Sequence, residues 1–276
     1  MTQNRPLVIY HGNCADGFGA AWCFWHEYGS NADYYPGVYS KAPPDVSGRD
    51  VYLVDFSYKR DVMKVIIEEA NKVVLIDHHK SAIEDLEGLP GLERFCDTNH
   101  SGAILAWNYL FPNTPRPLLL GHIEDRDLWK FKLKNTREIS AALFSHPYSF
   151  ELWDNLMFGG QKELLSLTIA GAAIERKHHK DIDELLDVCK RLMVIGGYTV
   201  PVASLPYTLS SDAAGKMAIG EVFAACYWDT RDNRTFSLRS QPDGIDVSKI
   251  AAEYGGGGHK NAAGFSVPRD HPLAVA

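Results

Sequence analysis

The sequence predicts an α/β protein with a parallel-sheet N-terminal domain and a smaller, mixed α/β C-terminal domain. In residues 1–140, short apolar runs alternate with helical patterns, which is typical of a parallel sheet. Residues 141–190 read as a helical linker, and strand-like segments return in residues 191–276. The chain has 276 residues, of which 45% are hydrophobic, so it is long and apolar enough to build two cores.

Three apolar runs in the first half predict the strands of the parallel sheet. Each is rich in the β-branched, aromatic and leucine residues that suit a strand buried on both faces. They are residues 7–10, 51–54 and 73–76. Apolar residues at helical spacing predict the intervening helices, which are residues 20–28 and 59–70. The glycine-containing residues 11–19 are expected to form a loop.

Each of these three strands ends in side chains that can bind a metal. These are His11 and Asp16 after the first strand, Asp55 after the second, and Asp77, His78 and His79 after the third. The carboxyl ends of parallel strands meet at one edge of the sheet, where open α/β sheets bind their ligands. Carboxylate and imidazole together suit Mn, Fe or Zn and the chemistry of phosphate esters. The sequence therefore predicts a site with enough ligands for one or two metal ions.

Helical patterns dominate the middle of the chain. Residues 101–110 predict a helix with Ser101 or Asn99 as its N-cap. A further helix leads into the charged cluster of residues 121–127, and residues 148–190 are largely helical in pattern. These segments separate the predicted catalytic domain from the strands of the second domain.

The C-terminal domain combines strands with a glycine run. The expected strands are residues 199–205, 224–228 and 234–239. The chain then reaches Gly255–Gly258, followed by His259 and Lys260. Such a run is either a flexible loop or a backbone that approaches an anion closely and presents N–H groups to it. Residues 261–264 are expected to begin a helix packed against another element, which favours the binding role.

The composition excludes several classes of protein. The formal charge of −7 and the pI near 5.9 argue against a broad basic surface for long duplex DNA. The five cysteines are scattered without a CxxC pair, so neither a disulfide framework nor a zinc finger is indicated. A polar start and the lack of an apolar run of about 18 residues predict no signal peptide and no spanning helix. We expect a cytoplasmic protein with no membrane partner, and a homodimer is compatible with the sequence.

These motifs closely resemble those of the DHH phosphoesterase superfamily over nearly the whole chain. Four motifs occur in the family's order: His11 to Gly17, Val54-Asp55, Asp77-His78-His79 and Asp125. The segment Gly255 to Gly264 is similar to the glycine-rich signature of the DHH-associated C-terminal domain, found in RecJ-like exonucleases and in the oligoribonuclease or pAp-phosphatase branch. The resemblance implies two domains with the active site in the cleft between them.

The resemblance also implies which residues hold the metal. The implied ligands are His11, Asp16, Asp55, His78 and Asp125, with Asp55 bridging two Mn ions. Fe, Zn or Mg, or a single ion, are the alternatives. Asp127 competes for the role of Asp125, and Arg126 could pair with either. The resemblance favours Asp125 because it is the first aspartate after Gly121-His122-Ile123-Glu124.

The first motif departs from the family pattern at one position. Relatives commonly carry two carboxylates separated by one residue, whereas here Cys14 stands two positions before Asp16. Cys14 could bind a softer metal, or it could pack as a small buried hydrophobe. The departure therefore leaves two alternatives to a pair of Mn ions, namely Fe or Zn, or one ion alone.

Catalytic and substrate-binding roles complete the predicted site. Asp55 is expected to hold the metals, Asp77 to orient a metal-binding imidazole, and His79 to face the substrate and assist the leaving oxygen. The expected substrate-binding residues are Arg239, Gly257, Gly258, His259, Lys260 and His100. Arg239 resembles the arginine with which these C-terminal domains grip a phosphate. His100 precedes a predicted helix start, which either binds phosphate or simply caps the helix.

The predicted activity is a metal-dependent phosphoesterase that uses metal-activated water. The expected substrates are short RNA or DNA oligonucleotides or small nucleotide phosphates, including nanoRNA, pAp and linear or cyclic dinucleotides. One alternative is a RecJ-like single-strand exonuclease, although neither an OB fold nor a long basic and aromatic channel is evident. Another is a non-catalytic nucleotide-binding or RNA-binding protein that has lost its metal. An inorganic pyrophosphatase or exopolyphosphatase is disfavoured by the glycine-rich signature.

Overall fold

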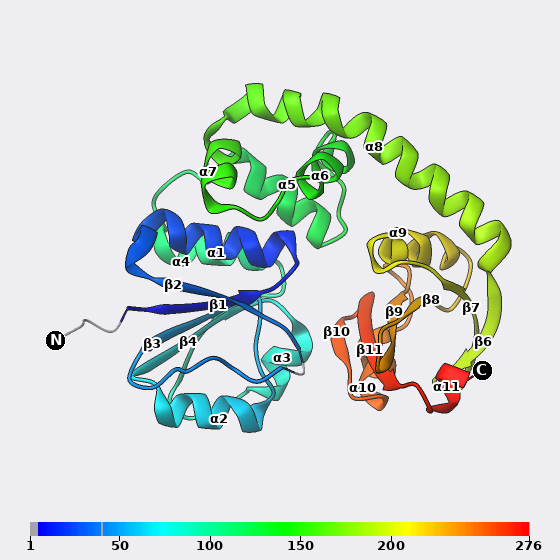
Figure 1. Cartoon of the computed structure of the whole chain (residues 1–276), viewed down its shortest axis with the longest axis horizontal. Coiled ribbons are helices and arrows are strands. Elements are labelled where there is room, and N and C mark those ends of the chain that lie inside the picture. Colours follow the sequence, from blue (N-terminus) through cyan, green and yellow to red (C-terminus); the bar gives the residue numbers. More distant parts are fainter. Residues whose placement is uncertain (1–4, 40, 276) are drawn as a thin grey trace. The chain divides into compact units, whose positions relative to one another are not determined.

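The computed structural model describes residues 5–39 and 41–275. The chain divides into two compact units, residues 1–175 and 176–276. The division falls within the long helix α8 (Gly160–Cys189), which continues through it (Figure 1). This helix fills most of the segment in which the sequence predicts a helical linker.

The N-terminal unit is built on an all-parallel sheet of five strands, ordered β2-β1-β3-β4-β5. The strands are β1 (Leu7–His11), β2 (Asp33–Gly37), β3 (Asp50–Val54), β4 (Lys72–Asp77) and β5 (Leu92–Cys96). The predicted parallel α/β class is confirmed. The chain leaves β1 for β2 on one side and continues through β3, β4 and β5 on the other. The topological switch point, where such sheets bind ligands, therefore lies between β1 and β3.

Helices cover both faces of this sheet (Figure 1). Helices α1 (Ala15–Tyr28) and α4 (Gly102–Leu110) lie on one face, and α2 (Arg60–Glu69) and the short α3 (Lys80–Asp85) lie on the other. Alternate residues of β4 separate accordingly: Val74 and Ile76 join the core under α1 and α4, whereas Val73 and Leu75 pack with Met63 of α2. Both faces of β4 are thus apolar up to its last residue.

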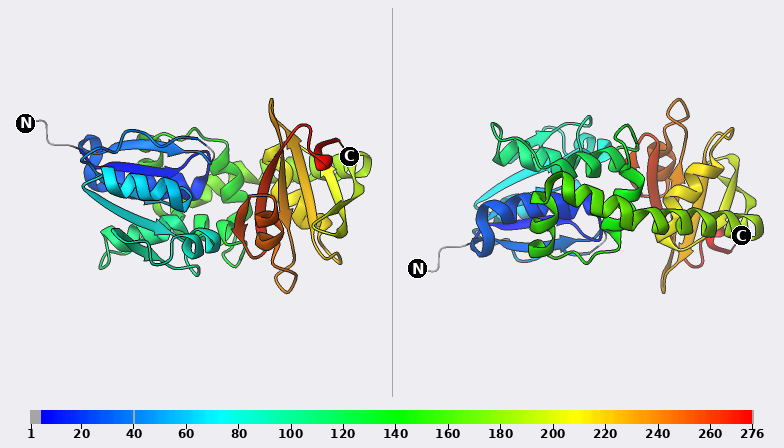
Figure 2. Two further views of the ribbon diagram at one scale, coloured as in Figure 1. Left: turned by 90° about the horizontal axis from the view of Figure 1, so that it is seen from below. Right: turned by 90° about the horizontal axis from the view of Figure 1, so that it is seen from above.

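Further helices extend the core beyond α1 and α4. They are α5 (Leu118–Asp127), α6 (Thr136–Phe144), α7 (Phe150–Phe158) and the first half of α8. The view from above in Figure 2 shows these green helices lying over the parallel sheet. Gly171 of α8 packs directly on α6, because a Cβ added there would lie 1.7 Å from the carbonyl oxygen of Glu138.

Three details of the N-terminal unit differ from the sequence prediction. Strands β2 and β5 were not predicted, because both are edge strands with exposed polar residues instead of a continuous apolar run. Helix α1 begins at Ala15, inside the predicted loop. Gly17 does not break the helix there but brings α1 onto β1, since a Cβ on it would lie 2.4 Å from the carbonyl oxygen of His11.

The C-terminal unit is a mixed sheet of six strands, ordered β10-β11-β9-β8-β7-β6. The strands are β6 (Arg191–Ile195), β7 (Tyr198–Ser204), β8 (Ala224–Asp229), β9 (Asn233–Arg239), β10 (Gly257–His259) and β11 (Ala262–Pro268). Helix α9 (Tyr207–Met217) and the end of α8 pack on one face, while α10 (Val247–Glu253) and α11 (Pro272–Val275) pack on the other. The predicted mixed α/β class and its three strands are confirmed.

The segment 261–264 is not helical, which corrects the sequence prediction. Ala262 begins β11, and the strand pairs with β10 on one side and β9 on the other. The glycine run is thus half of a β-hairpin turned by Lys260 and Asn261. Alanine and glycine suit a closely packed strand here, because a Cβ on Gly256 would lie 2.1 Å from the carbonyl oxygen of Gly264.

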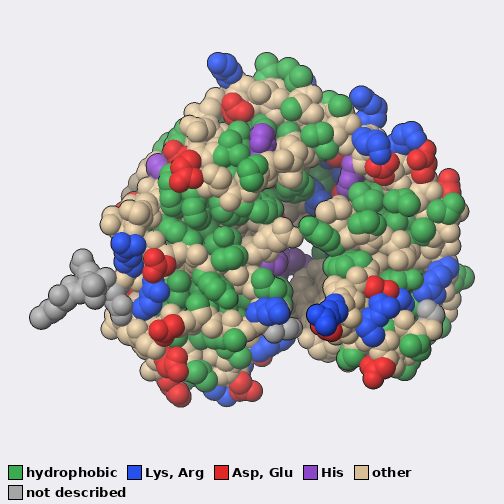
Figure 3. Space-filling model, viewed as in Figure 1, with side chains coloured by type: hydrophobic (Ala, Val, Ile, Leu, Met, Phe, Trp, Pro, Cys, Tyr) green, Lys and Arg blue, Asp and Glu red, His purple; other side chains and the backbone are tan. Residues whose placement is uncertain are grey.

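Charged side chains of both signs are mixed on the visible face of each unit (Figure 3). Among the described residues, no helix has the length and apolarity needed to cross a membrane.

The contact between α8 and α6 leads to a stability prediction. We expect Gly171→Ala to lower the free energy of unfolding by about 1–3 kcal/mol or more, because the added methyl group overlaps the backbone of α6. Gly121→Ala in α5 is the matched control, since its Cβ would meet only Leu133 at 3.6 Å; it should be neutral or stabilising by up to about 1 kcal/mol. Urea unfolding measures both, and equal effects would contradict the packing described.

Candidate metal centre

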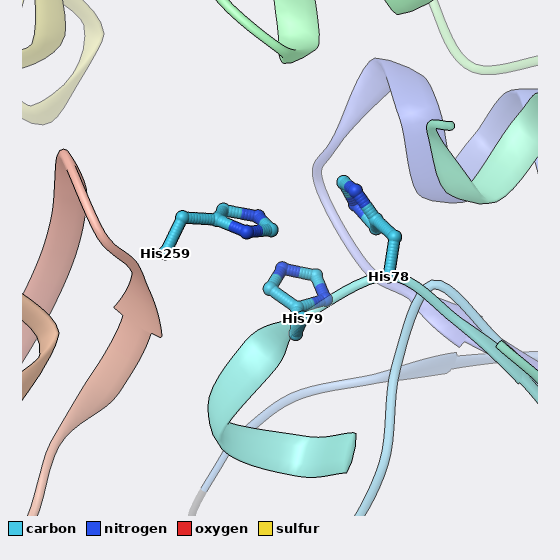
Figure 4. Close-up of side chains that lie close together, drawn as sticks. All are labelled: His78, His79 and His259. Carbon is cyan, nitrogen blue, oxygen red and sulfur yellow. The ribbon is translucent and has the colours of Figure 1, made fainter. Parts of the chain in front are cut away.

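The predicted metal-binding residues converge at the carboxyl ends of β1, β3 and β4. His11 is the last residue of β1, Asp55 directly follows β3, and Asp77 is the last residue of β4. His78 and His79 form the short connection between β4 and α3 (Figure 4). The apolar strands therefore deliver their polar ends to one edge of the sheet, at the switch point between β1 and β3.

Asp55 lies at the centre of this edge. Its Oδ1 lies 3.0 Å from Nε2 of His78 and 3.7 Å from Nδ1 of His79, and its Oδ2 lies 3.5 Å from Nδ1 of His11. The residue is buried and has a φ of 54°, a left-handed conformation that aspartate tolerates better than most residues. Strain of this kind in a buried residue is typical of a functional site.

Within the N-terminal unit, the donor atoms form two groups, and the contact between Asp55 and His78 connects them. The first group is His11, Asp55 and His79, and the second group is Asp16, His78 and Asp127. Within each group the ligand atoms lie within 4.8 Å of one another. His78 Nε2 of the second group also lies 3.6 Å from Asp16 Oδ2 and 3.5 Å from Asp127 Oδ2. The arrangement offers donors for one or two cations.

Asp16 is held by the start of α4. Its carboxylate accepts hydrogen bonds from the backbone N–H of Gly102 at 2.6 Å and of Ala103 at 3.1 Å. Only glycine fits at 102, since a Cβ would lie 2.5 Å from the Cβ of Asp55. The N–H groups at this helix start therefore bind a carboxylate of the protein itself, which is favourable at the positive end of the helix dipole.

His100 lies beside this helix start but outside both donor groups. Its Nδ1 lies 3.0 Å from Oε2 of Glu124, which also accepts the N–H of Ser101 at 3.2 Å. Ser101 is the N-cap of α4 and accepts a hydrogen bond from Ile104, so that alternative for the cap is confirmed. The contacts of His100 support the capping alternative for this segment.

Asp77 orients the imidazole of His79. Its Oδ1 accepts the N–H groups of His78 and His79 and lies 2.7 Å from Nδ1 of His79. A carboxylate only accepts, so Nδ1 of His79 carries a proton and Nε2 is the nitrogen that can serve another group. The charge and the hydrogen bond of Asp77 outweigh burial, which acts in the opposite direction, and raise the pKa of His79. The sequence predicted this supporting role for Asp77, but toward His78.

The structure brings Asp127, rather than Asp125, to the donor groups. Both oxygens of Asp125 are used elsewhere: they accept hydrogen bonds from the backbone N–H of Lys132 and of Leu133 and from the hydroxyl of Thr136. Asp125 therefore organises the loop between α5 and α6. Asp127 Oδ2 is buried and accepts no hydrogen bond from the described residues, so it can bind a cation.

Burial and mutual charge set the protonation of the site when it holds no ion. Burial acts to raise the pKa of Asp55, but hydrogen bonds from His11 and His78 hold it well below its usual range. Burial acts to lower the pKa of His78, but Asp55 and Asp127 raise this pKa to about 11. Burial and the charges of Asp55 and Asp127 raise the pKa of Asp16. The positive charge of the protonated imidazole thus compensates the negative charge of the carboxylates. A bound divalent cation would provide the same compensation.

Cys14 lies next to the carboxylates without belonging to either donor group. It is the N-cap residue of α1, in an extended conformation. Burial and the charges of Asp55, Asp127 and Asp16 raise the pKa of its thiol well above the usual range. A protonated thiol is a poor ligand, so this environment favours the packing alternative in the absence of a cation.

Two aromatic residues at the first donor group were not predicted. The ring of Tyr39 lies 5.4 Å from that of His11 and 5.0 Å from that of Phe56. Tyr39 is half exposed, at 52%. It follows the unpredicted strand β2, so no pattern in the sequence placed it near the site.

In the C-terminal unit, the predicted substrate-binding residues share one face of the sheet. Arg239 of β9 pairs with Ala262 of β11, which pairs in turn with His259 of β10. Residues in register on neighbouring strands point to the same face, so the arginine and the histidine flank a small alanine. Lys260 occupies the hairpin turn, and Gly257 and Gly258 precede His259 on the same strand.

Neutral groups hold the guanidinium of Arg239. Its Nη1 donates to the hydroxyl of Ser237 at 3.2 Å and to the carbonyl of Leu238 at 2.8 Å, and its Nη2 donates to the hydroxyl of Ser211 at 2.6 Å. These contacts fix the position of the guanidinium group. A fixed positive charge of this kind suits an anionic ligand.

Comparisons with known proteins found one sequence relative and several structural neighbours. No protein-family model matches the chain. The uncharacterised protein R106 of Acanthamoeba polyphaga mimivirus is 31% identical over 287 residues, which cover 94% of this chain and 67% of the relative. Among solved structures, the DHH domain of a member of the S1p family of ribosomal proteins aligns with a TM-score of 0.58 and 14% identity, over 96% of this chain and 83% of that one. The pGpG-specific phosphodiesterase PggH from Vibrio cholerae aligns with a TM-score of 0.47 and 15% identity, over 99% and 96% of the two chains.

The different roles of Asp125 and Asp127 can be separated in protein treated with EDTA. Asp125→Asn should lower the free energy of unfolding by about 1–3 kcal/mol, because an amide group replaces an acceptor that serves three donors. Asp127→Asn should leave stability unchanged or raise it, since it removes one of three neighbouring carboxylates. Urea unfolding measures both variants. Equal destabilisation by both would show that Asp127 also has a structural role and would remove the basis for its assignment to the donor group.

Proposed function

Because the chain belongs to one family with the mimivirus protein R106 and has the DHH fold, we propose that it is a metal-dependent phosphoesterase. The observation that carries the proposal is the pair of donor groups around Asp55, at the switch point of the parallel sheet. Carboxylates and imidazoles in this mixture suit a divalent cation that acts on phosphate esters. The buried, unbonded Oδ2 of Asp127 supports a cation at this place.

The proposed ligands differ from the predicted set in two respects: Asp127 replaces Asp125, and His79 is added. Asp16, His78 and Asp127 would hold one cation, and His11 and His79 a second, with Asp55 facing both. Mn is the proposed metal, because three carboxylates and three imidazoles form a set of hard and borderline donors without a thiolate. A bound cation would polarise a phosphoryl oxygen and make water a stronger nucleophile.

The residues of the chain would contribute orientation and proton transfer. Asp77 holds His79 so that Nε2 is the nitrogen available to a substrate, and the raised pKa of His79 favours the protonated ring. When one cation alone is bound, in the second group, His79 can therefore donate a proton to the leaving oxygen, as a general acid does. If His79 instead binds a cation, as its place in the first group allows, the solvent would supply that proton.

The proposed substrates are short oligonucleotides or small nucleotide phosphates. In the C-terminal unit, Arg239 and His259 flank Ala262 on one face of the sheet, so two basic side chains share that face. The side chains of Arg239, His259 and Lys260 would bind a phosphate. The acidic surface of the rest of the chain favours a short substrate over a long duplex.

Replacement of Asp55 tests the proposed activity. With Mn, wild-type protein should hydrolyse a dinucleotide, pAp or a cyclic dinucleotide, and EDTA should abolish the activity. Asp55→Asn should lower kcat/KM by at least about 100-fold, because it weakens both donor groups at once. Asp61→Asn is the matched control, since Asp61 is exposed on α2 and, among the described residues, pairs only with Lys64. Release of nucleotide products is the measurement.

The same assay separates the proposed activity from its rivals. Preference for a long single strand over a dinucleotide would identify a RecJ-like exonuclease. A non-catalytic binding protein would bind a nucleotide tightly without hydrolysing it, and its affinity would be unchanged in Asp55→Asn. Activity retained in Asp55→Asn would refute the metal centre itself.

Two arginines on β9 provide a matched test of substrate binding. Arg239→Lys should raise KM about tenfold, because lysine cannot reproduce the guanidinium fork, and it should also lower the unfolding temperature, because the hydrogen bonds to Ser237, Leu238 and Ser211 are lost. Arg234→Lys should lower stability but leave KM unchanged, since Arg234 forms a bidentate ion pair with Asp229 at 2.8 and 3.1 Å. Steady-state kinetics and thermal unfolding measure both variants. An unchanged KM in Arg239→Lys would exclude Arg239 as a substrate-binding residue.

A further inference from the structure

A pocket in the N-terminal unit shares no lining residue with the donor groups. It has a volume of about 500 Å³ and is lined by residues of α5, α6, α8 and the segments before α5 and α6. Its walls are largely apolar; they include Leu118, Leu133, Ile139, Leu164 and Leu165. A pocket of this size and character fits a small organic molecule.

The charges around this pocket have one sign. Arg116 and Lys134 line it, and none of the described lining residues is acidic. Both side chains are exposed, and no ion pair or hydrogen bond of either side chain occurs among the described residues. Two positive charges without a neighbouring carboxylate among the lining residues attract an anion. The pocket therefore favours an anion.

Helix starts add to this preference. Leu118, the first residue of α5, and Asn135, the N-cap residue of α6, both line the pocket. The side chain of neither N-cap residue, Pro117 nor Asn135, accepts a hydrogen bond from its helix. The positive ends of two helix dipoles thus lie at the pocket.

His122 supplies a buried polar group to the same pocket. It is 9% exposed and lines the pocket, and its Nδ1 lies 2.9 Å from the hydroxyl oxygen of Thr136. The Thr136 hydroxyl donates to Asp125, so Nδ1 of His122 must donate to Thr136. Nε2 of His122 has no partner among the described residues. Burial lowers the pKa of His122, so this nitrogen is an acceptor at neutral pH.

From these observations we infer that the pocket binds a small organic anion: a phosphate or carboxylate group on an apolar or aromatic body that also carries a hydrogen-bond donor. The anionic group binds Arg116, Lys134 and the helix starts, and the apolar body packs against the leucines. The donor reaches Nε2 of His122. A nucleoside monophosphate has all three features, and its binding here does not depend on the proposed hydrolysis.

Binding of AMP to EDTA-treated wild-type protein tests the inference, because metal removal eliminates phosphate binding at the donor groups. Isothermal titration should show saturable binding of AMP that is tighter than that of inorganic phosphate or decanoate, which lack the apolar body and the donor respectively. Lys134→Glu and Arg116→Glu should each raise the dissociation constant about tenfold or more, since a charge-assisted contact is lost. Both side chains are exposed, so the fold should persist.

Lys162→Glu is the matched control, because Lys162 is an exposed residue of α8 that does not line the pocket. Its dissociation constant for AMP should stay within about twofold of wild type. Absence of saturable binding by the wild type would overturn the inference, as would equal affinity for inorganic phosphate. Binding that survives Lys134→Glu but is lost in Arg239→Ala would place AMP in the C-terminal unit, which would overturn the pocket assignment and leave the proposed function standing.

Discussion

The convergence of three buried or half-buried carboxylates on His78 is the constraint on which the rest of the N-terminal unit depends. Charge removed from water must be paired or hydrogen-bonded. Asp16 meets this need through the N–H groups of α4, and Asp55 through two imidazoles. Asp127 retains a buried oxygen without a hydrogen bond. The close approach of α4, the glycine at 102 and the histidines after β4 all follow from this requirement, and a cation would complete it.

Much of the fold could be predicted from the sequence, because the central strands carry their signal in continuous apolar runs. Strands β1, β3 and β4 are buried on both faces, and this burial demands the pattern that identifies them. The edge strands β2 and β5 have neighbours on one side only and keep polar residues, so their sequences resemble loops. The start of α1 was missed because Gly17 suggests a turn in the sequence. In the structure, Gly17 lies inside the helix, where the close packing of α1 on β1 requires a glycine.

The site could be predicted where chain topology alone brings residues together. His11, Asp55 and His78 follow central strands, and parallel strands must deliver such residues to one edge. The partners of Asp77 and the hairpin formed by the glycine run depend on side-chain direction and strand pairing, which local pattern does not encode. Tyr39 reaches the site only through an edge strand that the pattern does not reveal.

Helix geometry explains why the two aspartates of α5 perform different tasks. Successive residues of an α-helix are about 100° apart around its axis, so positions 125 and 127 differ by about 200°. Asp125 faces the loop that it organises, and Asp127 faces His78. One side of the helix thus contacts the loop between α5 and α6, and the opposite side contacts the donor groups. A one-residue insertion between them would rotate Asp127 away from the carboxylates while preserving every acidic residue, so the count of acids in this motif says less about the site than their angular position.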